Sequence, residues 1–218
     1  MTLSPTPRTT LNREKQRAVS DRAALYDLLD RNLICHLGVI ADGAPRVLPT
    51  CYARDGDTLY LHGSTGTYSL RQTDTVCVSV TEFNGIVYAR SVFNFSINYA
   101  SALIYGVPER LEGEAKLEAL RVLSEHLAPG AWDYARQPTP KELAQTAVLR
   151  IDLAEASVKL REGDPEDEPE DYDLPVWAGV LPVEHRLLAP YPTADLADGI
   201  PMPAHVSARG GVVTQPWT

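Results

Sequence analysis

Short apolar segments separated by Asp-Gly turns constrain this chain more than any other feature of its sequence. LICHLGVI (33–40), RVLPTCYAR (46–54) and TLYLH (58–62) follow one another closely, with ADGAP and DGD between them. Asp-Gly between such segments is a strong hairpin signal, because both residues tolerate the positive φ angles of tight turns. These segments therefore predict an antiparallel meander. Pro49 inside the second strand indicates an edge, a bulge, or a place where something other than a strand meets the backbone.

Four further segments have the composition of strands. We take each of them as one strand: TVCVSV (75–80), GIVYARSV (85–92), INYASALIYGVPERL (97–111) and TAVLRIDLAEASVKLREG (146–163). The sequence thus predicts a mainly β fold with six or seven antiparallel strands and a few peripheral helices. Sheets of this kind usually close into a barrel or a sandwich, which removes their exposed edges.

Two helical segments and two polar termini surround the strands. SDRAALYDLLDRN (20–32) places its apolar residues on one helical face, and Ser20 or Asp21 can cap the first turn. EAKLEALRVLSEHLAPG (114–130) repeats leucine in helical register and stops at Pro-Gly. The expected division of the chain is an N-terminal arm (1–20), loose or draped on a partner, one domain (21–182) and a proline-rich C-terminal tail (183–218).

The charge and the apolar content argue against several classes of partner. The chain has 218 residues, a net charge of -9 and a pI near 5.0, so it lacks the basic excess that binding to nucleic acid requires. No apolar run approaches the roughly 18 residues that span a bilayer, and the N-terminus lacks the apolar segment of a secretory signal. We therefore expect a cytoplasmic protein with no nucleic acid or membrane partner.

The cysteines and histidines show no metal-binding pattern. Cys35, Cys51 and Cys77 are far apart in apolar surroundings, which favours buried, reduced thiols. The histidines occur singly, without the close spacing of metal ligands: His36, His62, His126, His185 and His205. No metal site is predicted from these residues.

The segment LYLHGSTGTYSLRQ (59–72) holds the most informative polar cluster. Its HGSTG lacks the Gly-x-Ser-x-Gly spacing of a serine hydrolase. Two interpretations remain open. His62 can be an ordinary hydrogen-bonded residue at a strand end, or residues 63–67 can form an anion site before a short helix predicted over GTYSLRQ. Arg46 and Arg71 would add positive charge to such a site.

The order of three segments resembles a known family. GAPRVLPTCYARDGDTLYLHGSTGTYSLR, YASALIYG and LPVWAGVLPV follow one another as in the flavin-binding split barrels related to pyridoxamine 5'-phosphate oxidase. The resemblance is nearest to the branch of nitroimidazole-resistance and flavin-nucleotide-binding proteins, and it covers residues 21–182. It implies an antiparallel split β-barrel of the FMN-binding type, which assembles as a homodimer with its cofactor sites at the interface.

The resemblance also implies which residues meet the cofactor. The strand from Arg46 to Thr50 would run along the flavin, the turn after Leu61 would flank it, and Trp177 would pack near the ring from the second subunit. The hydroxyls and backbone from Thr67 to Ser69 would hold the phosphate. The complete implied set is Arg46, Val47, Leu48, Pro49, Thr50, Leu61, His62, Gly63, Ser64, Thr67, Tyr68, Ser69, Ser101 and Trp177.

The function that the resemblance implies is an FMN-dependent oxidoreductase acting on a small molecule, with nitroreductase activity as one form of it. The alternative is a protein that binds or senses a flavin, a deazaflavin or haem without turnover. Relatives carry Arg or Lys where this chain has Thr67 and Tyr68. Because a cation is the strongest phosphate partner, this difference leaves FAD, F420 or haem as alternative cofactors. No catalytic residue is predicted.

Overall fold

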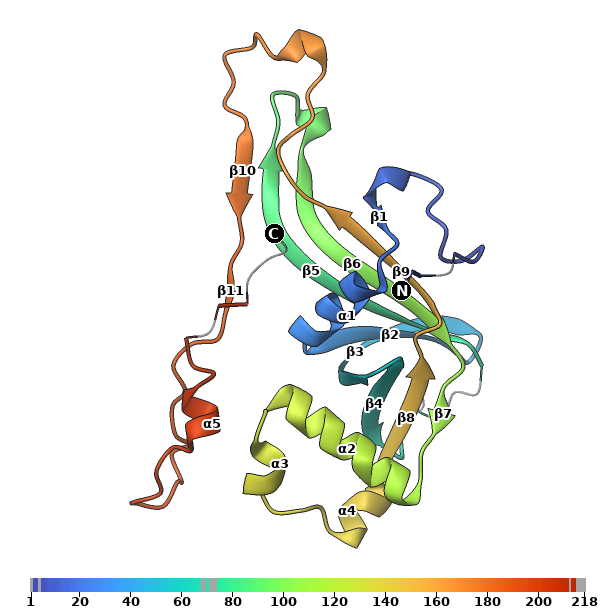
Figure 1. Ribbon diagram of the computed structural model, residues 1–218, viewed down its shortest axis with the longest axis vertical. Helices are drawn as coiled ribbons and strands as arrows, with labels where there is room; N and C mark the ends of the chain where they lie inside the picture. The colour runs from blue at the N-terminus through green and yellow to red at the C-terminus, as the bar shows by residue number, and fades with distance from the viewer. Residues whose placement is uncertain (1, 4, 68–69, 71–73, 212, 215–218) are drawn as a thin grey trace.

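An antiparallel sheet dominates the protein. The computed structural model describes residues 2–3, 5–67, 70, 74–211 and 213–214. Among these residues the main sheet has ten strands (Figure 1). In chain order they are β1 (Ala18–Val19), β2 (Ile34–Ala41), β3 (Ala44–Asp55), β4 (Thr58–Ser64), β5 (Val76–Tyr88), β6 (Ser96–Gly106), β7 (Glu109–Arg110), β8 (Thr146–Asp152), β9 (Glu155–Arg161) and β10 (Gly179–Pro182). A second sheet pairs β11 (His185–Arg186) with β12 (Val213–Thr214).

The strand order explains the shape of the sheet. It runs β1-β9-β6-β5-β2-β3-β4-β8-β7, with every neighbouring pair antiparallel, and β10 adds to the far half of β5. The two end strands, β1 and β7, do not pair with each other in the described part of the chain, so the barrel stays open. The predicted mainly β, antiparallel fold is confirmed. Three short strands, β1, β7 and β10, bring the number above the six or seven expected.

Short helices lie around the sheet. In the described residues they are α1 (Arg22–Arg31), α2 (Gly113–Leu127), α3 (Ala131–Tyr134), α4 (Pro140–Gln145) and α5 (Ala204–Ser207), with 3-10 turns η1 (Lys15–Arg17), η3 (Val92–Asn94) and η4 (Pro169–Asp171). The Asp21 carboxylate caps α1 by accepting a hydrogen bond from the Ala23 amide at 3.1 Å, as one of the two predicted caps required. None of the described helices is long and apolar enough to traverse a lipid bilayer.

Two apolar clusters fix the helices to the sheet. Leu25, Leu28 and Leu29 of α1 are fully buried against the inner face of the sheet, as the predicted helical face requires. A second, smaller cluster places Leu123 of α2 against Val148 of β8. Burying one leucine side chain contributes about 1.5–3 kcal/mol to folding. These two clusters therefore hold α1 and α2 against the sheet.

Two of the predicted strands are joined in the structure. Residues 75–80 and 85–92 supply one long strand, β5, whose register with β6 shifts between Phe83 and Gly85. A Cβ atom at Gly85 would lie 2.9 Å from the carbonyl oxygen of Leu181 on β10. Glycine is needed at this close approach, and the strand bends there instead of ending.

The predicted strand over 146–163 is divided into β8 and β9. At the break, the Asp152 carboxylate accepts a hydrogen bond from the Ala154 amide, and the Leu153 amide donates to the Asp57 carbonyl at 2.9 Å. The turn sends the chain across the molecule, because β8 pairs with β4 whereas β9 pairs with β6. Apolar residues keep alternating through this turn, so the sequence pattern gives no sign that the strand is interrupted there.

The predicted strand over 97–111 also ends early, at Gly106. A Cβ atom there would lie 2.6 Å from Cγ2 of Ile151 on β8, so the chain passes close to a distant part of the sheet. Beyond Pro108 the chain continues as β7, which pairs with β8. The connection thus moves the chain from the centre of the sheet to its other edge.

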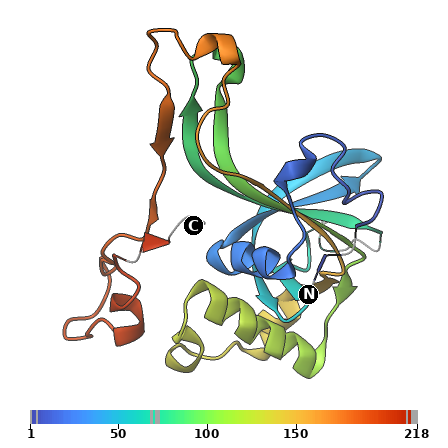
Figure 2. The same cartoon turned by 45° about the horizontal axis from the view of Figure 1, so that its top comes forward.

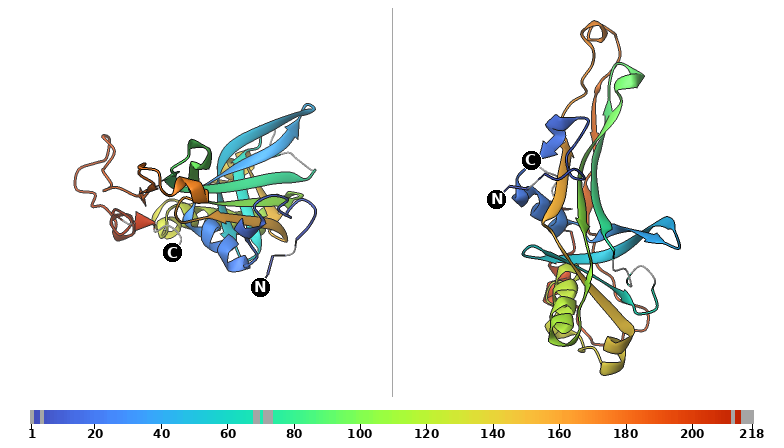
Figure 3. Two further views of the ribbon diagram at one scale, coloured as in Figure 1. Left: turned by 90° about the horizontal axis from the view of Figure 1, so that it is seen from above. Right: turned by 90° about the vertical axis from the view of Figure 1, so that its right-hand side faces the viewer.

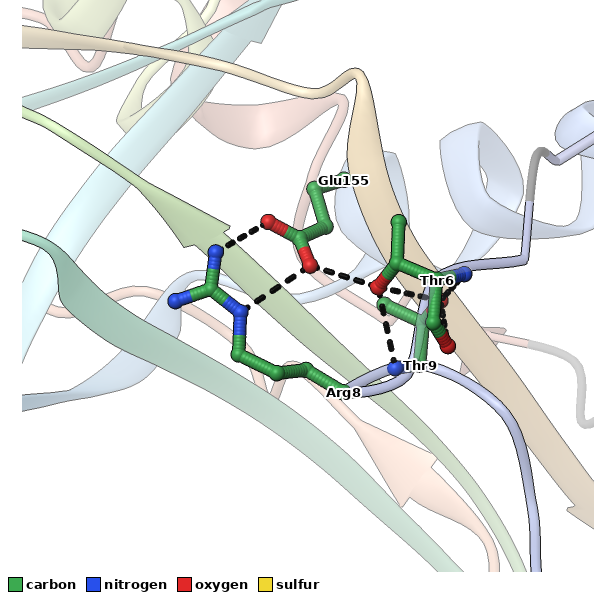
Figure 4. Close-up of polar contacts among 4 residues, drawn as sticks. All are labelled: Thr6, Arg8, Thr9 and Glu155. Carbon is green, nitrogen blue, oxygen red and sulfur yellow. Dashed lines mark hydrogen bonds and ion pairs between the residues drawn. The ribbon is translucent and has the colours of Figure 1, made fainter.

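The N-terminal arm packs on the protein's own sheet. Ala18 and Val19 form β1 against β9. Figure 4 shows Glu155 accepting hydrogen bonds from the Thr6 hydroxyl at 2.5 Å and from Nε of Arg8 at 3.0 Å. The bonds from Arg8 and Thr6 lower the pKa of the Glu155 carboxyl group. The boundary at residue 20 stays a prediction, although the arm and the sheet share these contacts.

The C-terminal tail leaves the sheet after β10 and returns to the helices. The Val183 amide donates to the Asn84 carbonyl at 3.0 Å, and further along the Arg209 guanidinium donates to the Leu127 carbonyl at the end of α2. Figures 1 and 2 show the tail running beside the body from β10 down to α5 near α2 and α3. It therefore spans from the far half of β5 to the end of α2.

Candidate functional site

Strand pairing gathers part of the predicted site on the outer face of the sheet. Pro49 of β3 lies opposite His36 of β2, which lies opposite Ser79 of β5. Ser101 of β6 lies opposite Thr81, two residues further along β5. Directly paired residues share a face of a sheet, as do residues two apart in a strand. Pro49 and Ser101 therefore face the same side, across four adjacent strands.

The first half of β3 has an edge that is free of any described strand. Residues 44–51 pair with β2 on one side, while β4 pairs only with residues 52–55. All positions from 44 to 49 are exposed, and Val47 retains 66% of its accessible surface. Figure 3 shows the β2–β3 hairpin projecting from the barrel. An exposed strand edge can hydrogen-bond to a ligand with its backbone N–H and C=O groups.

The remaining predicted residues of β3 do not all face one way. Arg46 lies opposite the buried Val39, so its side chain projects to the face opposite that of Pro49. It forms an ion pair with Asp42 at 2.8 Å near the hairpin turn. Leu48 and Thr50 lie two and four residues after Arg46 in β3, so their side chains point to the same face as that of Arg46. A ligand on the outer face would meet the Val47 and Pro49 side chains, and a ligand at the strand edge would meet the backbone.

The turn after β4 is held largely by its own atoms. The Ser64 hydroxyl accepts a hydrogen bond from the Gly66 amide at 3.2 Å, and the Ser64 carbonyl accepts one from the Thr67 amide at 2.9 Å. A Cβ atom at Gly63 would lie 2.6 Å from Cδ1 of Leu70, so packing explains that glycine. The exposed hydroxyls of Ser64 and Thr67 are the groups left for an anion. The predicted Tyr68 and Ser69, together with Arg71, lie outside the described residues.

His62 lies in a separate place, on the face of β4 covered by helices. Its neighbour Leu61 is fully buried in the barrel core, and His62 points the opposite way, into a cavity of about 340 Å³ beneath α2, α3 and α4. The His62 Nδ1 atom is buried and has no hydrogen-bond partner among the described residues. Burial lowers the pKa of the His62 imidazole, so the neutral ring prevails at neutral pH.

The wall of this cavity is mostly apolar, with one cation at its mouth. Leu120, Trp132 and Leu143 line it, and the Arg136 guanidinium is paired with the Glu142 carboxylate at 2.7 Å. Bonds from Arg136 and from Thr139 lower the pKa of Glu142 to about 2. A neutral imidazole in such a cavity can ligate a metal ion carried by a bound cofactor, while the guanidinium can meet an acidic group of that cofactor.

Sequence reasoning missed the residues that form this wall. Trp132 and Arg136 follow the Pro-Gly stop of the second helix, in a segment with neither helical nor strand periodicity. Their position depends on α3 and α4, which are each only a turn or two long. The one available signal was parity: Leu61 and His62 are adjacent in a strand and must face opposite sides.

Trp177 lies far from the other predicted residues within one chain. Trp177 is 68% exposed, and its ring centroid lies 5.9 Å from that of Tyr88, at the distal end of β5. Contact between this tryptophan and a flavin would require a second copy of the chain. The assignment of Trp177 to the cofactor site therefore stays a prediction.

Comparison with known proteins identifies the family. The model of the pyridoxamine 5'-phosphate oxidase family matches residues 21–160. The chain belongs to this family. That match agrees with the resemblance drawn from the sequence, and the solved relatives of the chain share the split-barrel fold. No curated protein matches the chain.

Two solved structures are similar over nearly the whole chain. The flavocytochrome Anf3 from Azotobacter vinelandii is 36% identical, with a TM-score of 0.90, and the match covers 95% of this chain and 98% of that one. The FAD- and haem-binding protein from Mycobacterium smegmatis is 37% identical, with a TM-score of 0.86, covering 89% and 98%. A candidate 5-nitroimidazole antibiotic resistance protein from Bacteroides thetaiotaomicron is 20% identical, with a TM-score of 0.56, covering 65% and 85%; it shares the fold.

Proposed function

We propose that this protein is a redox protein that binds a flavin and haem in the same chain. The observation that carries the proposal is His62, a buried imidazole with an unpartnered nitrogen in a mostly apolar cavity. Leaving a buried polar atom without a hydrogen bond is costly, so a bound group that satisfies it is favoured. The two relatives at 36% and 37% identity, one a flavocytochrome and one named for FAD and haem, support both cofactors.

The residues around His62 fit haem in kind. The neutral His62 ring would ligate the iron, Trp132 and Leu120 would cover the apolar macrocycle, and Arg136 would hold a propionate at the mouth. Haem, when bound, supplies a one-electron redox centre. The apolar wall would exclude water from it, and the imidazole would stay unprotonated because burial lowers its pKa.

The flavin is placed on the exposed side of β3. The free edge of residues 44–51 would hydrogen-bond to the ring, Ser101 would face it across the sheet, and the hydroxyls of Ser64 and Thr67 would meet a phosphate. We assign FAD in place of the FMN expected from the sequence, because one of the two similar proteins is named for FAD. The flavin would carry two-electron chemistry on a small molecule.

A second copy of the chain completes the flavin site in this proposal. Ile34 and Ile40 of β2 and Val47 of β3 remain 56%, 62% and 66% exposed beside the expected flavin position. Apolar side chains gathered on one sheet face are usually covered by a partner. A homodimer would bury them and would bring the partner's Trp177 towards the ring.

Absorbance spectroscopy of two matched variants tests the haem assignment. We expect the purified protein to show both flavin and Soret bands, and His62→Ala to lose the Soret band while keeping the flavin bands. His205→Ala is the control, because His205 packs on Tyr134 outside the His62 cavity. Equal haem content in the two variants, or a haem-free protein from cells supplied with haem, would overturn the assignment.

Anaerobic titration separates an enzyme from a cofactor holder. Addition of NADH or NADPH should bleach the flavin absorbance, and a small-molecule acceptor should restore it. A flavin that photoreduction bleaches but neither nucleotide does would leave the protein as a binding or sensing protein. Reduction of nitro compounds stays a prediction, since the nitroimidazole-resistance relative shares only the fold.

A further inference from the structure

A second cavity lies between the C-terminal tail and the body of the protein. Its volume is about 590 Å³, larger than that of the His62 cavity, and the two have no lining residue in common. The body contributes Arg31 and Glu82, and the tail contributes Arg186, Leu187 and Arg209. Pockets of several hundred cubic ångströms commonly hold small molecules. The proposed function assigns no ligand to this cavity.

The charge of the cavity is unusual for a protein with a net charge of -9. Its two carboxylates are already paired: Asp30 with Arg54 at 2.5 Å, and Glu82 with Arg31 at 3.3 Å. Arg186 and Arg209, by contrast, form no ion pair with a carboxylate in the part of the chain that the structure describes. The cavity thus presents two guanidinium groups that no carboxylate among the described residues neutralises.

Glu82 supplies a hydrogen-bond acceptor in the wall of this cavity. It is only 8% exposed, and one carboxylate oxygen accepts a hydrogen bond from the Asn32 amide at 3.2 Å. Its Oε1 atom is buried and lies 3.3 Å from the Arg31 guanidinium, its ion-pair partner. A buried carboxylate oxygen in a cavity wall is an acceptor for a hydroxyl or amine of a bound molecule.

The wall is held in place on both sides. Nε2 of His126 donates to the Asn32 carbonyl at 2.9 Å on the body, and Nε2 of His185 donates to the Phe83 carbonyl at 2.8 Å on the tail. The Arg209 guanidinium also donates to the Leu127 carbonyl, which fixes this end of the tail. The backbone on both sides of the cavity and the Arg209 guanidinium are therefore positioned before a ligand arrives, which reduces the entropy cost of binding.

We infer that this cavity binds a nucleoside diphosphate group. The guanidinium groups of Arg186 and Arg209 hold the phosphates, since planar guanidinium is the best match for their oxygens. Glu82 accepts a hydrogen bond from a ribose hydroxyl, and the apolar side chains of Leu33 and Leu187 cover the base. The group belongs either to a separate nucleotide, such as the reductant, or to the FAD of the proposed function, whose diphosphate would then lie here in place of Ser64 and Thr67.

Calorimetric titration of the whole protein with ADP and with inorganic pyrophosphate tests the inference. We expect both to bind, and the double variant Arg186→Ala with Arg209→Ala to weaken both by about tenfold or more. Arg121→Ala is the matched control, because this arginine is exposed on α2 and pairs with Glu118 outside the cavity. Absence of binding of both probes to the protein freed of FAD, or an equal loss in the control, would overturn the inference.

A second variant tests the role of Glu82 and guards against misfolding. Glu82→Gln keeps the shape of the side chain and should weaken ADP, which has a ribose, without weakening pyrophosphate. Retained pyrophosphate binding shows that the variant is folded. Weakening of both probes in a variant whose circular dichroism matches that of the wild type would contradict the assignment of Glu82.

Comparing ADP binding to protein loaded with FMN and to protein loaded with FAD shows which molecule carries the nucleoside diphosphate group. If ADP binds to protein loaded with FMN but not to protein loaded with FAD, the cavity holds the diphosphate of the cofactor itself. If ADP binds to both, the ligand is a separate nucleotide. ADP binding needs neither haem nor flavin reduction, so a colourless protein that binds ADP would refute the proposed function and leave this inference standing.

Discussion

At the scale of single residues, His62 decides how the protein is interpreted. A strand-end histidine beside Gly-Ser-Thr-Gly can be an ordinary polar residue or part of an anion site, and the sequence leaves both open. In the structure the glycine and hydroxyl residues form a self-bonded turn at the end of β4, while the imidazole, further back on the strand, enters the cavity beneath α2, α3 and α4. His62 and Ser64 therefore serve the haem and flavin assignments, respectively, although they are two residues apart.

The buried imidazole should make stability depend on pH. Because burial lowers the pKa of His62 below its ordinary 6.5, the unfolded state takes up a proton at a higher pH than the folded state does. The contribution of His62 is therefore intact above pH 6.5 and is lost as the pH falls towards the folded-state pKa. We expect cofactor-free His62→Gln to lose less stability than the wild type on acidification, in denaturant unfolding at several pH values. Parallel pH profiles would contradict this.

At the scale of elements, the sequence predicts strands and helices well but not where long strands bend or divide. Alternation of apolar residues is local, so it identified the strand content of residues 146–163 without the turn at Leu153. It separated the two halves of β5, because the bend at Gly85 depends on the carbonyl of a distant strand. Strand partners that come from far along the chain leave no mark in a local pattern.

Gly85→Ala tests the packing of β10 on β5. The added Cβ would lie 2.9 Å from a backbone oxygen, and backbone cannot turn aside as a side chain can. We expect a loss of about 1–3 kcal/mol of unfolding free energy, typical of overpacking, with faster proteolysis of the C-terminal tail. Gly38→Ala is the control, because its Cβ would have an ordinary contact of 3.4 Å with the Cys77 carbonyl. Equal stability of the two variants would contradict the account.

The N-terminal arm is expected to depend on one carboxylate. Glu155 accepts hydrogen bonds from both Thr6 and Arg8, so the single substitution Glu155→Ala removes both of these side-chain bonds between the arm and β9. Amide hydrogen exchange should then rise for residues 5–11, while the strands of the barrel keep their protection. Unchanged exchange in the arm would mean that the apolar contacts of Leu3 and the pairing of β1 suffice to hold it.

At the scale of the whole molecule, the His62 cavity is separate from the other two candidate sites, whereas the tail cavity adjoins the flavin face, because His36 and Thr81 of that face line it. The exposed edge of β3 is assigned to a flavin, the cavity under α2 to haem, and the cavity beneath the C-terminal tail to a nucleoside diphosphate. The family and its fold could be predicted from the order of sequence segments. The haem cavity could not, because Trp132 and Arg136 reach His62 only through the folding of two short helices.

Native mass spectrometry tests the central claim, that two chains assemble with a flavin and a haem in each. The predicted result is a single main species with the mass of two chains, two FAD and two haem, which loses both haems, but not the flavins, in His62→Ala. Two results, from cells supplied with haem and riboflavin, would contradict the account. One is a main species with the mass of a single chain, and the other is a dimer that lacks FAD or haem.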